Sequence, residues 1–211
     1  MKIKILTIFP EMFDSVLSSS ILGRAREQGL IDVSCVDIRP YSDRKHKNTD
    51  DYPFGGGAGM VMLAQPIMDA MADVTGPDFH GRRIYLGPRG KTLTTALARA
   101  LAREEELVLL CGHYEGVDQR ALDTCVDEEI SIGDYILTGG ELAAMVLTDC
   151  VARFIPGVLG SAEARRRSPS RMACWNIRSI PVRGSCGAWR CRRCCFPATM
   201  RRSAPGGGWN R

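Results

Sequence analysis

Three glycine-containing segments each follow a stretch with the apolar character of a buried strand. They span residues 85–90, 111–116 and 132–140. In a parallel sheet, the loops that leave the carboxyl ends of the strands share one edge, and ligands bind there. Glycine lets the backbone approach a flat ligand closely and exchange hydrogen bonds with it. The three loops together therefore predict a ligand site, although tight turns explain any single loop equally well.

The sequence lacks the motifs of two other common kinds of site, those for nucleotides and those for metal ions. The sequence has neither a Gly-x-Gly-x-x-Gly fingerprint nor a Gly-x-x-x-x-Gly-Lys-Ser/Thr phosphate loop, which argues against a dinucleotide or a nucleoside triphosphate. The histidines His46, His80 and His113 have no Cys partners at ligand spacing, so no metal site is predicted. His113 and Glu115 could form an acid/base pair, but a loop histidine is more often a hydrogen-bonding residue.

The elements that must position these loops alternate between strand and helix patterns. Strands are expected at residues 2–9, 31–38, 83–86, 106–111 and 126–132. Helices are expected at residues 10–17, 21–28, 65–73, 93–103, 116–122 and 139–154. This alternation predicts an α/β fold, a mainly parallel sheet with helices on both faces. Residues 41–59 fit no regular element and are expected to form a long functional or flexible loop.

Charge and cysteine divide the 211-residue chain into two unlike parts. The net charge of +4 hides an acidic stretch at residues 1–163, which holds all 24 acids, and a tail at 164–211 with twelve Arg and no acid. Five of the nine Cys and all three Trp also lie in the tail. No apolar run is long enough for a membrane span and no signal peptide is visible, so we expect a cytoplasmic globular protein without a membrane partner.

Several segments resemble the bacterial tRNA (guanine-N(1))-methyltransferase family TrmD, a member of the SPOUT methyltransferases. Among them are Cys-Gly-His-Tyr-Glu-Gly-Val-Asp at residues 111–118 and Ser-Ile-Gly-Asp-Tyr-Ile-Leu-Thr-Gly-Gly-Glu-Leu at residues 131–142. The remaining matching segments are residues 5–13, 50–60 and 153–160. The resemblance covers residues 1 to about 163. It implies a SPOUT-type fold with a trefoil knot in the carboxyl half of the sheet, and a homodimer with the active site at its interface.

The resemblance also implies a reaction, in which S-adenosylmethionine methylates N(1) of guanosine at position 37 of tRNA. Residues of the three loops would bind this methyl donor: Tyr85, Leu86, Pro88, Gly112, Tyr114, Glu115, Ile132, Gly133, Asp134, Tyr135, Ile136, Leu137, Gly139 and Gly140. The glycines Gly55, Gly56, Gly57 and Gly59 would lie beside the target guanine. Arg153 would be a catalytic residue that helps to stabilise it, although a cation there could equally cap a helix. A magnesium requirement fits the family, but no ligand set for it is visible.

One part of the family's machinery is missing from the chain as written. N(1) of guanine carries a proton at neutral pH, so the reaction needs a general base. In the family, the proposed base is an aspartate just after the knot, in a segment that leads to a small tRNA-binding domain. Read in a shifted frame, the codons of residues 171–183 can spell Asp-Gly-Leu-Leu-Glu-Tyr-Pro-Gln-Tyr-Thr-Arg-Pro, which resembles this segment. We therefore expect a SPOUT-like methyltransferase domain at residues 1–160 and an out-of-frame, disordered tail at 161–211, from a frameshift or a sequencing error.

The tail and the chain as a whole each allow a second interpretation. A genuine Arg-rich tail would suit contacts with RNA phosphates. A metal site around Cys191, Cys194 and Cys195 would need a second Cys/His pair, which does not stand nearby. The alternative to an active methyltransferase is a catalytically impaired remnant that binds S-adenosylmethionine or RNA. A generic nucleotide-binding α/β domain would need the phosphate loop that is missing.

Overall fold

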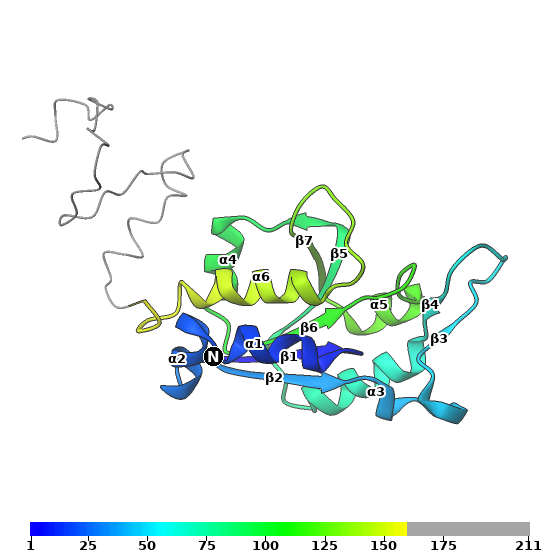
Figure 1. Ribbon diagram of the computed structural model, residues 1–211, viewed down its shortest axis with the longest axis horizontal. Coiled ribbons are helices and arrows are strands. Elements are labelled where there is room, and N and C mark those ends of the chain that lie inside the picture. Colours follow the sequence, from blue (N-terminus) through cyan, green and yellow to red (C-terminus); the bar gives the residue numbers. More distant parts are fainter. Residues whose placement is uncertain (160–211) are drawn as a thin grey trace, which may run out of the picture. The chain divides into compact units, whose positions relative to one another are not determined.

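Five parallel strands form the central sheet of the protein. The computed structural model describes residues 1–159, and the predictions made for the tail lie outside these residues. The strand order is β2-β1-β6-β5-β7 (Figure 1). The strands are β1 (Lys2–Thr7), β2 (Asp32–Asp37), β5 (Arg82–Thr92), β6 (Glu106–Cys111) and β7 (Glu128–Ser131). The predicted α/β fold with a mainly parallel sheet is confirmed.

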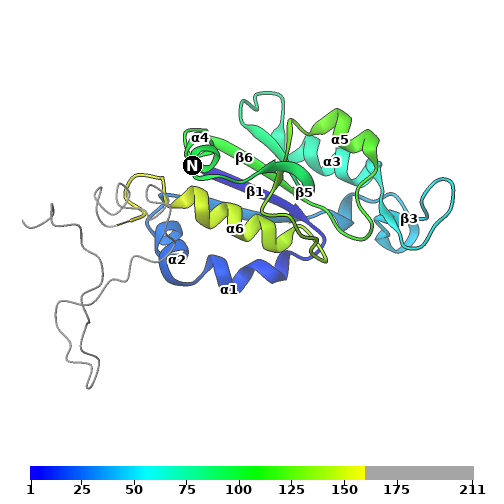
Figure 2. The same ribbon diagram turned by 90° about the horizontal axis from the view of Figure 1, so that it is seen from above.

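Helices cover both faces of this sheet (Figure 2). One face carries α1 (Asp14–Leu17), α2 (Ser20–Glu27), α4 (Thr95–Leu101) and α6 (Glu141–Ala152). The other face carries α3 (Ala64–Thr75) and α5 (Gln119–Cys125). Within residues 1–159, no helix is both long enough and apolar enough to cross a membrane.

The central strand β6 shows why the sheet is buried on both faces. Its side chains alternate, so that Leu107 and Leu109 pack with α4 and α6, whereas Val108 and Leu110 pack with α3 and α5. All four side chains are fully buried. A parallel sheet covered on both faces requires such a continuous apolar run, and the arrangement leaves only the strand ends and their loops free for polar chemistry.

Besides shifted element ends, such as those of α5 (Gln119–Cys125) against the expected 116–122, three segments differ from the sequence predictions. The helix expected at residues 10–17 begins as a 3₁₀-helix, η1 (Pro10–Phe13), and the tighter winding leaves Met12 43% exposed while Phe13 is buried. The strand expected at residues 83–86 is longer, because β5 bulges after Leu86 and pairs with β7 again at Lys91. The expected long loop at residues 41–59 is partly regular: it follows η2 (Arg39–Tyr41) and contains η3 (Lys45–Lys47) and β3 (Asp50–Asp51), which pairs antiparallel with β4 (Val61–Met62) just after the loop.

Candidate functional site

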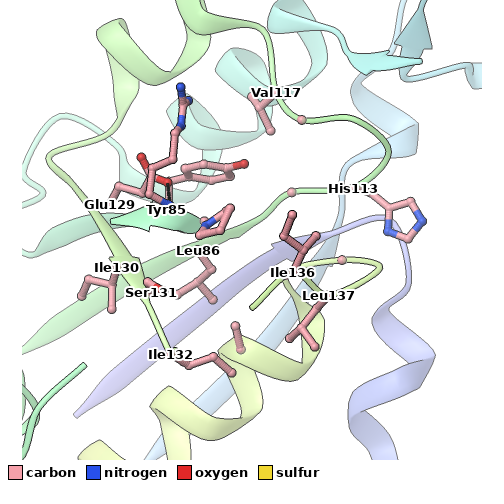
Figure 3. Close-up of a pocket in the computed structure, with 18 of the residues that line it drawn as sticks. Tyr85, Leu86, His113, Val117, Glu129, Ile130, Ser131, Ile132, Ile136 and Leu137 are labelled. Atoms are coloured by element: carbon pink, nitrogen blue, oxygen red, sulfur yellow. Dashed lines mark hydrogen bonds between the residues drawn. The ribbon is translucent and has the colours of Figure 1, made fainter. Parts of the chain in front are cut away.

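The three glycine-containing loops meet at the carboxyl edge of the sheet. Together they enclose a cavity of about 380 Å³, which is lined by the bulge of β5 and by the segments that follow β6 and β7 (Figure 3). A cavity of this size is in the range of small-molecule sites. The apolar part of its wall includes Leu86, Ile130 and Ile132, which come from the strand ends.

The cavity collects most of the residues predicted to bind a methyl donor. It is lined by Tyr85, Leu86, Pro88, Gly112, Tyr114, Glu115, Ile132, Gly133, Tyr135, Ile136, Leu137, Gly139 and Gly140. Asp134 is the exception, because its side chain is exposed and does not line the cavity. The structure therefore groups these residues around one space, and Asp134 stands outside the group.

The remaining predicted residues do not line the cavity. Gly55, Gly56, Gly57 and Gly59 belong to the hairpin between β3 and β4. Arg153 is the residue at the carboxyl end of α6, thirteen positions after Gly140. At 1.5 Å per helical residue, this separation is about 20 Å. One copy of the chain therefore does not bring Arg153 to its own cavity.

The bulge of β5 brings its backbone against β7, and glycines make this approach feasible. A side chain on Gly87 would collide with the carboxylate of Glu129, and one on Gly90 with the backbone of Glu129. Oε1 of Glu129 accepts a hydrogen bond from the N–H of Arg89 at 3.2 Å. Glu129 and Arg89 both line the cavity, and neither was predicted from the sequence. Nothing in the sequence marks Glu129, because its role follows from the pairing of β7 with β5.

The loops after β6 and β7 pack against each other through glycine. The N–H of Gly140 donates to the carbonyl oxygen of Gly112 at 2.8 Å. An added Cβ on Gly140 would lie 2.8 Å from Cα of Cys111, and one on Gly112 would lie 2.8 Å from Oη of Tyr85. Burial raises the pKa of Tyr85, so its phenol stays neutral at physiological pH. These contacts fix one wall of the cavity with main-chain atoms.

Glu115 connects the cavity to the glycine hairpin. Its N–H donates to the carbonyl oxygen of Met60 at 2.9 Å, and a Cβ on Gly59 would collide with the Glu115 side chain. Gly59 has a φ of +88°, a conformation that favours glycine. At the tip, Gly55 and Gly56 have nothing within 4 Å of an added Cβ. The base of the hairpin thus touches the cavity rim, whereas its tip projects away from other atoms.

The loop after β7 presents apolar side chains to solvent beside the cavity. Ile136 is 85% exposed and Tyr135 is 54% exposed. The start of this loop is held by Ser131, whose hydroxyl donates to the carbonyl oxygen of Gly133 at 2.9 Å. Exposed apolar groups around a concave site are typical of a surface that a ligand covers. The loop therefore offers a partial cover for a molecule in the cavity.

The charges of the cavity favour a cationic ligand. Its lining contains the carboxylates of Glu115 and Glu129 and the guanidinium of Arg89. Within residues 1–159, no group of three or more His, Cys, Asp and Glu side chains has an arrangement that could hold a metal ion. The combination of apolar walls, glycine backbone in the lining and two acids suits an organic ligand with a flat apolar part and a positive charge.

Comparisons with known proteins agree with one another. The sequence model described as "tRNA (Guanine-1)-methyltransferase TrmD" matches residues 1–174. A tRNA (guanine-N(1)-)-methyltransferase of Ruminiclostridium cellulolyticum is 56% identical over 162 residues, which are 76% of this chain and 70% of that protein. The corresponding protein of Alkaliphilus metalliredigens is 56% identical over 164 residues, which are 76% of this chain and 66% of that protein. The chain thus spans about two thirds of the length of these relatives.

A solved structure shows the same fold. The crystal structure of tRNA (m1G37) methyltransferase from Aquifex aeolicus superimposes with a TM-score of 0.71 and 35% sequence identity. The match covers 76% of this chain and 72% of the Aquifex chain. Sequence and structure therefore lead to one conclusion. The chain belongs to the tRNA (guanine-1)-methyltransferase TrmD family.

Proposed function

We propose that this chain is an S-adenosylmethionine-dependent methyltransferase that modifies N(1) of guanosine at position 37 of tRNA in the cytoplasm. The observation that carries the proposal is the cavity formed by the loops after β5, β6 and β7, with main-chain atoms on one wall and two carboxylates in its lining. The Aquifex protein, which is named as a tRNA (m1G37) methyltransferase, supports the choice of nucleotide. A SPOUT-type trefoil knot in the carboxyl half of the sheet is part of the same proposal.

The residues of the cavity fit S-adenosylmethionine chemically. This donor combines a flat adenine ring with a sulfonium cation, and it supplies an electrophilic methyl group when bound. Leu86, Ile132 and Ile136 could make apolar contacts with the ring, and Gly112 and Gly140 belong to the same lining. Glu115 and Glu129 favour the positive charge. The part of these residues is to bind and orient the donor and to exclude water from the methyl group.

The acceptor guanine belongs on the side of the glycine hairpin in this proposal. Gly59 touches Glu115, so a guanine held at this end of the hairpin would lie next to the donor cavity, and Gly55, Gly56 and Gly57 are proposed to contact it from the rest of the hairpin. A base must leave the RNA stack to reach this place. The proton on N(1) must then be taken up by a general base, which in the family is the aspartate of the segment after the knot.

Arg153 requires a second copy of the chain in order to take part. It lies about 20 Å along α6 from Gly140, too far to contact a guanine at its own cavity. We therefore propose a homodimer in which Arg153 of one copy stabilises the guanine bound at the other copy. Leu142 and Val146 on α6 are 48% and 47% exposed, and such apolar side chains on one helix suit an interface.

A second candidate function follows from the composition of the tail. Residues 164–211 contain no Asp or Glu, so the family's aspartate is missing from the chain as written. A catalytically impaired remnant that binds S-adenosylmethionine or RNA is therefore the alternative. We propose a methyltransferase domain at residues 1–160 and an out-of-frame tail at 161–211 under both candidates. A restored frame would return the aspartate and favour the active methyltransferase, whereas a confirmed frame would favour the remnant.

Methyl transfer to defined tRNA transcripts tests the proposal. The full chain and its frame-restored version are incubated with radiolabelled S-adenosylmethionine and transcripts that carry guanosine or adenosine at position 37, with magnesium or with a chelator. We expect 1-methylguanosine only in the guanosine transcript, and less of it with the chelator. Donor binding without transfer by the chain as written would favour the remnant. If neither version binds the donor, the proposed function is wrong.

A further inference from the structure

A buried carboxylate at the start of α6 forms a hydrogen bond with the end of β1. Glu141, the first residue of α6, is only 2% exposed. Its Oε1 accepts a hydrogen bond from the hydroxyl of Thr7 at 2.8 Å, across 134 positions of the chain. Oγ1 of Thr7 in turn accepts the N–H of Phe9 at 3.0 Å. The amino-terminal end of a helix favours a negative charge, which helps to explain an acid at this buried place.

The second oxygen of this carboxylate faces His113. Oε2 of Glu141 lies 3.9 Å from Nδ1 of His113, too far for a hydrogen bond. This Nδ1 is buried and has no hydrogen-bond partner. Buried polar atoms are rarely left without a partner, and leaving one is unfavourable. The two groups are therefore placed so that a short movement of the ring would bring them within hydrogen-bond distance.

His113 links this pair to the cavity because it belongs to the loop after β6. His113 is part of the cavity lining, whereas its ring points away from the centre (Figure 3). The ring packs edge-on against Phe9 and Tyr114, each with 5.0 Å between ring centroids. The backbone N–H of His113 donates to Sδ of Met62 at 3.2 Å. A shift of the ring toward Glu141 would therefore move the wall that Gly112 and Tyr114 form.

Gly139 keeps the space between the two side chains open. A Cβ on Gly139 would collide with Oε2 of Glu141 and would lie 2.6 Å from Nδ1 of His113. Gly139 also forms an isolated antiparallel bridge with His113. Any other residue at this position would occupy the gap. Gly139 therefore lines the cavity and also leaves room for His113 and Glu141 to approach each other.

We infer that Glu141 is a positioning residue, which sets the loop after β6 by holding the ring of His113. A small rotation of the imidazole closes the 3.9 Å gap, so that Nδ1–H of His113 donates to Oε2 of Glu141, and S-adenosylmethionine binds to the loop in this arrangement. The identity of this ligand rests on the proposed function. The positioning of the loop rests on contacts within the chain alone.

A double-mutant cycle on the full chain tests the link. Glu141→Gln keeps the shape of the side chain but removes its charge, and His113→Phe keeps the aromatic packing but removes Nδ1. Each substitution is expected to raise the Kd for S-adenosylmethionine, measured by titration calorimetry, about tenfold. Because both break one interaction, the double variant should also lose about tenfold rather than about a hundredfold. Asp149→Asn, an exposed acid on the same helix, should leave the Kd unchanged.

Hydrogen exchange tests the positioning without any ligand. Both single variants should speed amide exchange in residues 111–116, and unfolding measurements should show that each remains folded. Thr7→Val should act in the same direction because it frees Glu141, and Thr7→Ser, which keeps the hydroxyl, should restore slow exchange. Unchanged exchange in this loop, or additive effects on Kd, would overturn the inference. If the wild-type chain does not bind the donor, the proposed function fails, and exchange still decides the positioning.

Discussion

Gly112 stands so close to Tyr85 that a Cβ at residue 112 would lie 2.8 Å from the phenol oxygen. Tyr85 is itself only 7% exposed, so its ring has little room to move away. The contact joins the end of β6 to β5 just before its bulge and defines one wall of the cavity. The absence of a side chain at residue 112 is therefore a structural requirement and not only an aid to ligand approach.

Gly112→Ala should damage both stability and donor binding. Overpacking of this kind costs about 1–2 kcal/mol, which urea unfolding would measure. We expect the Kd for S-adenosylmethionine to rise about tenfold. The added substitution Tyr85→Phe removes the nearest atom and should restore part of the stability. A Gly112→Ala protein with wild-type stability and affinity would contradict the packing described here.

Ile136→Ala should weaken donor binding with almost no effect on stability. Ile136 is 85% exposed, so its truncation removes little buried surface from the folded chain. If the donor covers it, the loss of apolar contact should cost about 1–2 kcal/mol of binding free energy. Met12→Ala, at an exposed position that does not line the cavity, is the control and should leave the Kd unchanged. An unchanged Kd for Ile136→Ala would show that the loop does not cover the donor.

Glu129→Gln should discriminate between charged and uncharged ligands. The amide can still accept the N–H of Arg89, so the bulge of β5 is kept, but the negative charge is lost. We expect the Kd for S-adenosylmethionine to rise about fivefold, because a carboxylate attracts the sulfonium. S-adenosylhomocysteine, which lacks that charge, should be affected much less. Equal losses for both ligands would place the sulfonium away from Glu129.

Asp127→Asn should lower stability at neutral pH but not in acid. The Arg83 guanidinium donates to Asp127 at 2.7 Å and 3.1 Å and lowers the pKa of this carboxyl below its ordinary 3.8. A lowered pKa contributes stability above the unfolded value and loses it as the pH falls through the folded value. Because the pair is partly exposed, we expect a difference of about 0.5 kcal/mol at pH 7. Urea unfolding should show this difference disappear as the pH falls below the ordinary pKa.

The sequence predicted the sheet and the loops well because both depend on local patterns. Apolar runs such as the one in β6 mark buried strands, and glycines mark the turns that follow them. The pairing of Thr7 with Glu141 was invisible, because only the fold brings residues 134 positions apart together. The bulge of β5 escaped prediction for the same reason, since pairing with β7 resumes only through tertiary contact. The exposure of Asp134 depends on how its loop turns, which glycine content alone does not determine.

A crystal structure of the full chain with S-adenosylmethionine is the most direct test of the proposed donor site. We predict that the donor lies in the cavity and contacts the bulge of β5 and the loops after β6 and β7, with its sulfonium on the side of Glu115 and Glu129. The ring of His113 should move to within hydrogen-bond distance of Glu141. A donor bound elsewhere on the chain, or one that contacts none of the three loops, would contradict the proposed site.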